Sequence, residues 1–566
     1  ESLNAADNGL TYNTKTNDKE TNIYDVIPTA KKGYYSEFEI IKGELYYKGD
    51  VEQKLIWAKE LGIGIIPYEI VDGVLISSNS NLLLLDSTGT VRIPYNVTVI
   101  ASGVFNNLEG LTRVIIPGSV KIIGTNAFSN NTSLQEVVME EGTRIIGSNA
   151  FSGCSNLTTF KMSNTVTQIG DQAFYYCTKL KNINLSNSLT EIKANGFRGC
   201  QSLDNIVLPE GVRSLGDASF YLCTSLQKIV ISSTLNSIGN YTFTRCSSLI
   251  DIQIDSKNLY FTFENNKLYS KNKDYLYFVT KNSIESSANE ITIEEGMKGI
   301  SYGALEFCTN AKILNLPSTI NSVNRNFIPN NLEKINIAEG NNIYSSDGVN
   351  VYEDATSTLV ISVTKEKNVS VRSGTKIIAS CAFQGCENLE SITLNNELES
   401  IGNQVFQGTK IKSIYIPASV TYLNPLFITY AHNISSITID PENPSYTSDN
   451  KFVYNKSKTE IITYYKSESI VEIPEGIEKI GAQAFYDKNM VKNITIPNTV
   501  KEISSSFYYC SGLTSITIPN SVEKINGNCF LYCNNLAQIN VDNTKNSISG
   551  APWGCPYGMR AVNWLR

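Results

Sequence analysis

Cysteine is the residue type in this sequence whose spacing most invites a chemical interpretation. Five of the twelve cysteines recur at one fixed interval, each three positions after a phenylalanine: Cys154, Cys177, Cys200, Cys223 and Cys246. Thiolates bind zinc or form disulfides, but zinc needs C-x-x-C pairs or histidine partners that this sequence lacks. Asn131 takes the same place in another copy, which favours a buried thiol acting as a small apolar side chain. For two pairs that are close in sequence, Cys381 with Cys386 and Cys529 with Cys533, a disulfide is an alternative.

Other residues that commonly act in catalysis are few. His432 is the only imidazole, and we expect a surface or capping role for it. The sequence has no nucleophile elbow, H-E-x-x-H, P-loop or dinucleotide-binding pattern. Acid pairs such as Glu140-Glu141 precede the glycine of a repeated turn, where solvent surrounds them; a glycosidase-like carboxylate pair stays open. DPENPSYTSDN could bind calcium but lacks the EF-hand spacing. We predict a non-enzymatic protein with no cofactor and no metal.

Composition narrows the class of protein further. The 566 residues carry a net charge of −7 and no basic stripe that could follow a phosphate backbone, so nucleic acid is not an expected partner. The longest apolar run, LGIGIIPYEIVDGVLI, contains Glu69 and Asp72 and is too short to span a membrane. The chain opens on Glu1 without a leader, which fits a mature protein from which a secretion signal was removed.

A regular repeat must position all of these residues. Seven phenylalanines stand at equal spacing without a slip: Phe105, Phe128, Phe151, Phe174, Phe197, Phe220 and Phe243. Each period also carries an L-x-x-I-x-L phrase, such as Leu180, Ile183 and Leu185, and an Ile-Gly pair before the phenylalanine. This phrase, recurring at this period, is the mark of a leucine-rich repeat solenoid. We expect a mostly β fold with a curved parallel sheet and short helical or irregular turns, because one coil cannot enclose a core alone.

The period breaks three times. The phenylalanine position is next filled by Leu305 after Phe243, by Phe383 after Phe327 and by Phe485 after Phe427, and each of these gaps is more than twice the usual spacing. The extra segments, about 255–290, 338–370 and 440–470, each contain two β-rich runs around Asn, Asp or Gly turns and predict β-hairpins. They are either enlarged coils of the same solenoid or lateral binding platforms that present Tyr269, Tyr352 and Tyr454.

The two ends of the chain differ from the repeats between them. We expect residues 1–30 to be a polar, flexible segment and residues 31–90 to form a cap that covers the first coil, with a hairpin in SEFEIIKGELYYKG and a helix over 51–61. The solenoid then spans 91–550. Residues 551–566 predict a second cap, in which Trp553 and Trp564 cover the last coil.

The repeat resembles a known family. IPGSVKIIGTNAFSNNTSLQEVVM and LPEGVRSLGDASFYLCTSLQKIVI are similar to the treponemal-type, BspA-like leucine-rich repeat, which reads approximately LxxIxLPxxVxxIGxxAFxxC. The resemblance covers about residues 90–550. It implies a secreted or surface-attached bacterial protein that takes part in host interaction through adhesion.

Two classes of function follow. The first is an adhesin-like binder of an extracellular protein or glycoprotein, and the second is a passive component of a surface layer; a carbohydrate-binding or glycan-processing accessory role is a remote third. In L-x-x-I-x-L, the residues two and four after the first Leu point outward, and they are the candidate contacts: Lys161, Asn184, Lys228 and Tyr415. We expect a monomer.

Overall fold

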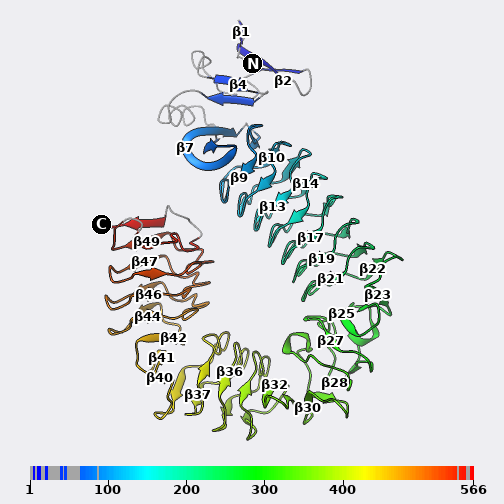
Figure 1. Ribbon diagram of the computed structural model, residues 1–566, viewed down its shortest axis with the longest axis vertical. Coiled ribbons are helices and arrows are strands. Elements are labelled where there is room, and N and C mark those ends of the chain that lie inside the picture. Colours follow the sequence, from blue (N-terminus) through cyan, green and yellow to red (C-terminus); the bar gives the residue numbers. More distant parts are fainter. Residues whose placement is uncertain are drawn as a thin grey trace. The chain divides into compact units, whose positions relative to one another are not determined.

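The computed structural model describes residues 4–6, 9–14, 19–22, 38–41, 44–47, 64–85, 88–544, 547–555 and 561–566 (Figure 1). It is a mostly β, parallel solenoid of about 21 turns. The chain folds into two compact units. Unit 1 comprises Glu1–Ala288, Gly296–Ala311 and Asn326–Pro329; unit 2 comprises Asn289–Glu295, Lys312–Arg325 and Asn330–Arg566.

Each regular coil of unit 1 contributes one short strand to each of two parallel ladders. Ladder A contains the L-x-x-I-x-L strands: β8 (Thr90–Arg92), β10 (Arg113–Ile116), β12 (Glu136–Met139), β14 (Thr159–Lys161), β16 (Asn182–Ile183), β18 (Asn205–Val207), β20 (Lys228–Ile231) and β22 (Asp251–Ile254). Ladder B contains β9 (Val99–Ile100), β11 (Ile122–Ile123), β13 (Ile145–Ile146), β15 (Gln168–Ile169), β17 (Glu191–Ile192), β19 (Ser214–Leu215) and β21 (Ser237–Ile238). Val114 pairs with Val137 and Val137 with Phe160, so the register advances by one 23-residue period per rung.

The third side of each coil is a turn that carries the repeated phenylalanine. Successive rings from Phe105 to Phe243 lie 4.9–6.3 Å apart with nearly parallel planes, and all are buried. The Ile-Gly pair before each turn is explained by close approach. A Cβ atom on Gly147 would lie 2.5 Å from the carbonyl oxygen of Ile123 in the preceding coil, so a larger residue would force the coils apart.

The repeated cysteines lie behind these rings and make directional contacts. The Sγ atom of Cys200 donates to the carbonyl oxygen of Phe174 in the preceding coil at 3.2 Å, and the other four thiols of the series do the same with the corresponding phenylalanines. The Asn131 amide donates to the Phe105 carbonyl oxygen from the same place. The position therefore selects a small buried donor, which the interpretation as a purely apolar side chain missed.

All twelve cysteines are buried and free. In the two pairs for which a disulfide was an open alternative, three of the four thiols have separate polar contacts. Cys386 donates to the Ser362 carbonyl oxygen, Cys381 contacts the Gln404 side chain, and Cys533 donates to the Phe507 carbonyl oxygen.

Unit 2 repeats the same two-ladder plan. Its ladder A strands are β26 (Glu290–Thr292), β28 (Ile313–Leu316), β29 (Lys334–Ile337), β33 (Asn368–Ser370), β35 (Ser391–Thr393), β37 (Ser413–Ile416), β39 (Ser436–Ile439), β43 (Ile470–Glu472), β45 (Asn493–Thr495), β47 (Ser515–Ile518), β49 (Gln538–Val541) and β50 (Val562–Trp564). Its ladder B strands are β34 (Ile377–Ile378), β36 (Ser400–Ile401), β38 (Tyr422–Leu423), β44 (Lys479–Ile480), β46 (Glu502–Ile503) and β48 (Lys524–Ile525). Short 3-10 turns occur at Ile284–Ser286 in unit 1 and over Arg325–Phe327.

The three insertions are antiparallel meanders of three strands, not the two-stranded hairpins that the sequence predicts. They comprise β23 (Phe261–Glu264), β24 (Lys267–Ser270) and β25 (Tyr275–Val279); β30 (Tyr344–Ser346), β31 (Asn350–Glu353) and β32 (Thr358–Ser362); and β40 (Tyr446–Ser448), β41 (Phe452–Asn455) and β42 (Glu460–Tyr464). The last strand of each pairs in parallel with the next ladder B strand: β25 with β27 (Gly299–Ile300), β32 with β34, and β42 with β44. Each insertion is therefore an enlarged coil of the solenoid.

One asparagine fixes the start of each meander. The side-chain amide of Asn443 donates to the carbonyl oxygens of Pro417 and Val420, and its oxygen accepts from the backbone N–H groups of Ser445 and Tyr446. Asn258 and Asn341 make equivalent sets of four hydrogen bonds. Since buried polar backbone must be paired, this side chain joins the irregular entry of the meander to the preceding coil.

The described N-terminal strands form two small antiparallel sheets, followed by a hairpin that begins ladder B. Within residues 1–30 the described strands are β1 (Asn4–Ala6), β2 (Gly9–Thr14) and β3 (Lys19–Asn22), and β4 (Phe38–Ile41) pairs antiparallel with β5 (Glu44–Tyr47). The helix expected over 51–61 lies outside the described residues. β6 (Gly64–Val71) and β7 (Val74–Leu85) form a hairpin, and β7 begins ladder B by pairing with β9.

At the other end, the repeat does not break where the sequence indicated. Trp553 lies one repeat period after Phe530, is buried, and contacts that ring edge-on at 6.5 Å. Trp564 lies on β50 and contacts Trp553 in turn. The final segment is thus one more coil, in which tryptophan takes the phenylalanine position.

Phe174→Ala tests the ring stack. Phe174 lies between Phe151 and Phe197 and meets Phe160 edge-on, so we expect the free energy of unfolding to fall by about 3–5 kcal/mol, as for other buried phenylalanines. Urea unfolding measures the change. Tyr260→Ala, at a side chain that is 48% exposed, is the control and should change it by less than about 0.5 kcal/mol. Equal effects would contradict the assignment of the core.

Thiol labelling tests the cysteine positions. Burial raises the pKa of Cys154 and of Cys510 to about 12, and the reactive form of a thiol is the thiolate. At pH 8 the native protein should therefore react slowly, first at Cys381, which has the highest exposed fraction of the set at 9%, while the denatured protein should expose twelve thiols. Rapid labelling of several thiols in the native protein would refute the prediction that they are buried. A chain mass lowered by the hydrogen atoms lost in disulfide formation would refute the prediction that they are free.

Candidate binding surfaces

The outward face of ladder A in unit 1 carries the first group of predicted contacts. Lys161 and Asn184 are exposed, and the Lys228 side chain is 37% exposed. They lie on nearby rungs: Thr159 pairs with Asn182 in the parallel register, and Lys228 lies on β20, two rungs further on, in the next run of paired strands, β18–β20–β22. The structure therefore brings these three candidates onto one face.

Ion pairs between rungs partly neutralise this face. Glu136 lies 2.7 Å from the Arg113 guanidinium and 3.7 Å from the Lys161 amine, and Lys228 lies 3.6 Å from Asp251. Such exposed pairs contribute little to stability, so they are free to exchange for contacts with a partner. Val207, on the rung between Asn184 and Lys228, is 62% exposed and adds an apolar contact to the row.

Tyr415 lies on the outward face of ladder A in unit 2. Its side chain is 50% exposed, and its hydroxyl donates to Asp440 Oδ2 on the next rung at 2.7 Å. That hydrogen bond raises the pKa of Tyr415 and lowers the pKa of Asp440. The candidate is thus accessible, with its ring held in place by its neighbour.

The three insertion tyrosines are not accessible, which corrects their assignment to a binding platform. Tyr269, Tyr352 and Tyr454 are only 5%, 4% and 2% exposed. The residue before each tyrosine is buried as well, with a register shift between the two, so both sides of the strand are covered at these positions. Arg372 covers the Tyr352 ring at 3.6 Å, and the Tyr454 hydroxyl donates to Asp449. They stabilise the meanders and cannot contact a partner.

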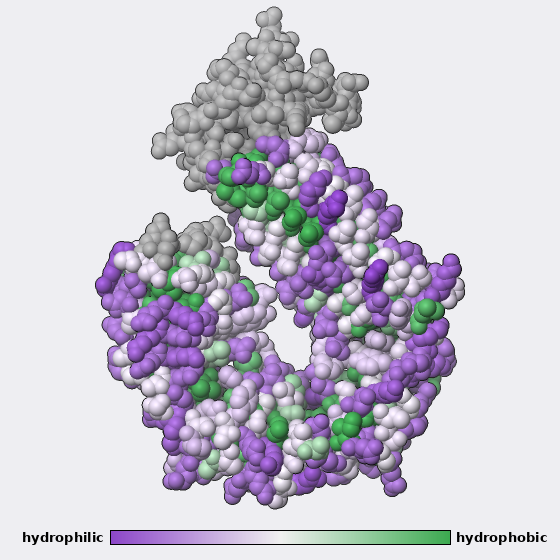
Figure 2. Space-filling view, in the orientation of Figure 1, coloured by the Kyte–Doolittle hydropathy of each residue, from purple (hydrophilic) through white to green (hydrophobic). Residues whose placement is uncertain are grey.

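Ladder B of unit 1 bears an apolar strip that was not predicted from the sequence. Its outward positions are Val99, Ile122 and Ile145 on the first three rungs and become polar from Gln168 onward. Figure 2 shows this strip where β9, β11 and β13 lie. The L-x-x-I-x-L phrase predicts outward positions only in the ladder A strands, although the second strand of each coil alternates in the same way.

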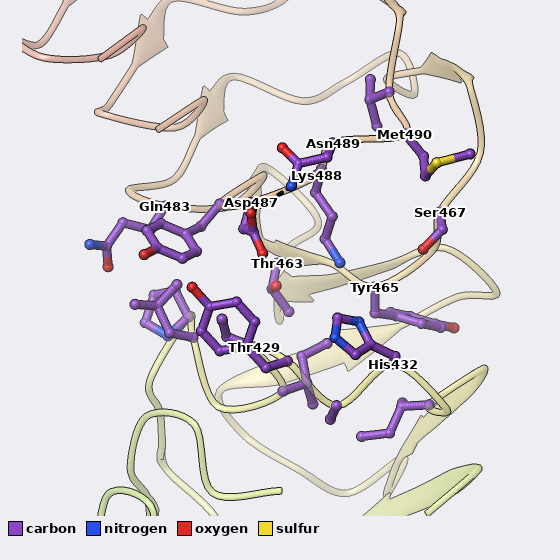
Figure 3. Close-up of a pocket in the computed structure, with 18 residues that line it drawn as sticks. Thr429, His432, Thr463, Tyr465, Ser467, Gln483, Asp487, Lys488, Asn489 and Met490 are labelled. Atoms are coloured by element: carbon purple, nitrogen blue, oxygen red, sulfur yellow. Dashed lines mark hydrogen bonds between the residues drawn. The ribbon is translucent and has the colours of Figure 1, made fainter. Parts of the chain in front are cut away.

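A pocket in unit 2 was also missed. It has a volume of about 200 Å³ and lies between the turn around Tyr430 and the turn around Tyr486, with Thr463 and Tyr465 from the third meander beside them (Figure 3). The meander supplies a ladder strand but no phenylalanine turn, so the two turns it separates do not stack directly. His432 is exposed on this wall, consistent with the surface position expected of it.

Lys488 is the unusual residue of this pocket. It follows Phe485 by three positions, which is where the repeat elsewhere places a cysteine. The side chain is half-buried and its amine points into the cavity, 5.8 Å from the Tyr464 ring (Figure 3). Burial lowers the pKa of Lys488 to about 8. The sequence does contain a signal for this residue: a lysine stands at a repeat position that elsewhere holds a small hydrogen-bond donor.

A half-buried carboxylate and a buried guanidinium lie beside the other two breaks. Next to the first meander, burial raises the pKa of Glu306 to about 7, and the carboxylate accepts a hydrogen bond from the Arg245 backbone. Beside the second break, Arg325 is 6% exposed, and burial lowers its pKa. Among the described residues, no three His, Cys, Asp or Glu side chains come together to hold a metal ion.

Lys488→Met tests the energetic state of the amine. A lysine pKa near 8 instead of 10.5 corresponds to a cost of up to about 3 kcal/mol at pH 7, which methionine removes. The variant should therefore be more stable than the wild type at pH 7. Between pH 8 and 10.5 the unfolded chain binds the additional proton, so the advantage should shrink as pH rises through this range. Denaturant unfolding at several pH values measures it, and Lys492→Met, at an exposed lysine, should show neither effect.

Comparison with known proteins identifies the repeat. The family model described as BspA type leucine rich repeat region (6 copies) matches residues 84–196, 167–287, 262–349, 361–471 and 463–552. No curated protein sequence matches the chain.

Solved structures of leucine-rich repeat proteins are similar to this chain at low identity. A leucine-rich repeat protein from Eubacterium ventriosum is 16% identical over 80% of this chain and 92% of its own, with a TM-score of 0.33. A leucine rich cell surface protein from Faecalibacterium prausnitzii is 20% identical over 82% and 94%, with a TM-score of 0.22. Since the family model matches well over half of the residues, the chain belongs to the BspA-type leucine-rich repeat family.

Proposed function

We propose that this is a secreted or cell-surface bacterial protein that binds an extracellular protein or glycoprotein without catalysis, through the outward face of ladder A in unit 1. The observation that carries the proposal is the row of exposed and half-buried side chains on successive rungs, from Arg113 to Asp251. Seven rungs at about 4.8 Å spacing span about 29 Å, long enough for one side of a standard protein interface.

The chemistry of the row favours many moderate contacts over a few strong ones. Lys161, Asn184 and Lys228 offer donors, Val207 offers apolar area, and opposite charges alternate between rungs. Because no single sign of charge dominates, affinity should depend only modestly on salt. The surface location is supported by the family to which the repeat belongs. Separately, no helix of the described residues is long and apolar enough to cross a membrane.

A triple substitution tests the proposed face. The purified chain is first applied to an array of matrix proteins, mucins and glycans to obtain a ligand. Replacing Lys161, Asn184 and Lys228 together by alanine should then weaken binding to that ligand at least tenfold, which corresponds to about 1.4 kcal/mol. Surface plasmon resonance at two salt concentrations measures the change.

The matched control lies on the same coils but on ladder B. Gln168, Glu191 and Ser237 occupy equivalent outward positions there, and their joint replacement by alanine should leave affinity unchanged. Equal losses in both variants would contradict the assignment to ladder A. An array without any ligand would instead favour the alternative function, a passive component of a surface layer.

A further inference from the structure

The pocket around Lys488 combines features that point to a ligand. Its walls carry many groups that can hydrogen-bond hydroxyls, including Thr429, Thr463, Ser467, Gln483 and Asn489. At about 200 Å³ it is smaller than the roughly 300 Å³ at the lower end of sites for drug-sized ligands, so it has room for one small polar unit.

A cation faces this cavity without a counter-ion. In the described part of unit 2, no carboxylate lies within ion-pair distance of the Lys488 amine; Asp487 is close enough to act on it electrostatically, but one of its oxygens accepts from the Asn489 amide. Removing an ammonium from water without a partner is costly. Other coils fill this position with a small thiol, so nothing in the repeat requires a charge here.

Aromatic rings continue from the pocket along the neighbouring coils. Tyr430 and Tyr486 both lie on its wall. The Tyr486 ring stacks on Tyr508 at 6.0 Å, Tyr508 meets Tyr532 edge-on at 5.4 Å, and Tyr509 stacks on Tyr532 at 4.5 Å. Together these five rings form a row, which we call the tyrosine row, that begins at the pocket.

We propose that this pocket binds a single carboxylated sugar unit, whose carboxylate pairs with the Lys488 ammonium while its ring contacts Tyr430 and Tyr486. The C–H face of a pyranose is apolar with slightly positive hydrogens, which suits the negative face of an aromatic ring. The hydroxyl and amide groups of the walls match the ring hydroxyls. One cation with Asp487 beside it favours a singly charged carboxylate over a doubly charged phosphate.

The tyrosine row indicates the path that a longer ligand would follow out of the pocket. A glycan whose terminal acidic unit occupies the pocket would extend over Tyr508, Tyr509 and Tyr532, where further sugar rings meet aromatic surface. The site lies in unit 2 and uses none of the ladder A residues of unit 1. A negative result for this pocket would therefore not contradict the proposed protein-binding face, and the reverse also holds.

Titration of the full chain with defined sugars tests the proposal. The acidic probes are N-acetylneuraminic acid and glucuronic acid. Glucose and N-acetylglucosamine serve as neutral sugars, and acetate and phosphate serve as simple anions. Saturation-transfer NMR detects the binding of each probe, and calorimetry measures its affinity. At least one acidic sugar should bind more tightly than every neutral sugar and every simple anion. Lys488→Met should weaken that binding at least tenfold while raising the melting temperature, which separates loss of the site from loss of the fold.

Two further variants complete the test. Lys492→Met changes an exposed lysine nearby and should leave binding unchanged, while Tyr430→Leu should weaken acidic and neutral sugars alike. Equal binding of neutral and acidic sugars, or no effect of Lys488→Met, would overturn the role of the amine. Acetate or phosphate binding as tightly as the acidic sugars would overturn the sugar assignment, and absence of binding to every probe would overturn the site.

Discussion

The stacking of each coil on the next, in a register of one repeat period, is the constraint on which the rest of the structure depends. A single coil has no interior of its own. Phe174 becomes buried only because Phe151 and Phe197 cover its two faces, and its backbone N–H is paired only because the next coil supplies the carbonyl oxygen of Gly196. Every residue that recurs with the period contributes to this contact between neighbours.

Hydrogen bonding in the interior explains which residues the repeat tolerates. The turn after each phenylalanine leaves a carbonyl oxygen facing the next coil, and a small donor must reach it. Cysteine usually supplies this donor and Asn131 does so once. At the irregular entries of the meanders, Asn258, Asn341 and Asn443 serve the same need with four hydrogen bonds each.

The regular contacts between coils are interrupted at the breaks in the repeat. A meander continues ladder B but omits the phenylalanine turn, so side chains next to it lose their usual neighbours. Lys488 then occupies a position that otherwise holds a thiol, at a cost in stability and beside a cavity. Polar groups that destabilise a fold commonly mark the place where a protein acts, and this is why the pocket carries the further inference.

The sequence by itself determined the repeat, the parallel stacking, the burial of the phenylalanines and the location of the three insertions, because periodicity directly encodes contacts between neighbouring coils. It also predicted that Lys161, Asn184 and Lys228 face outward, since strand alternation is a local property. Only the tertiary structure decided that Tyr269, Tyr352 and Tyr454 are buried, that the thiols are donors and that Lys488 faces a cavity. The buried tyrosines and the cavity beside Lys488 depend on which segments meet at the meanders, and no period specifies such contacts. The thiol contact does recur with the period, but its direction is a matter of hydrogen-bond geometry that the sequence pattern does not state.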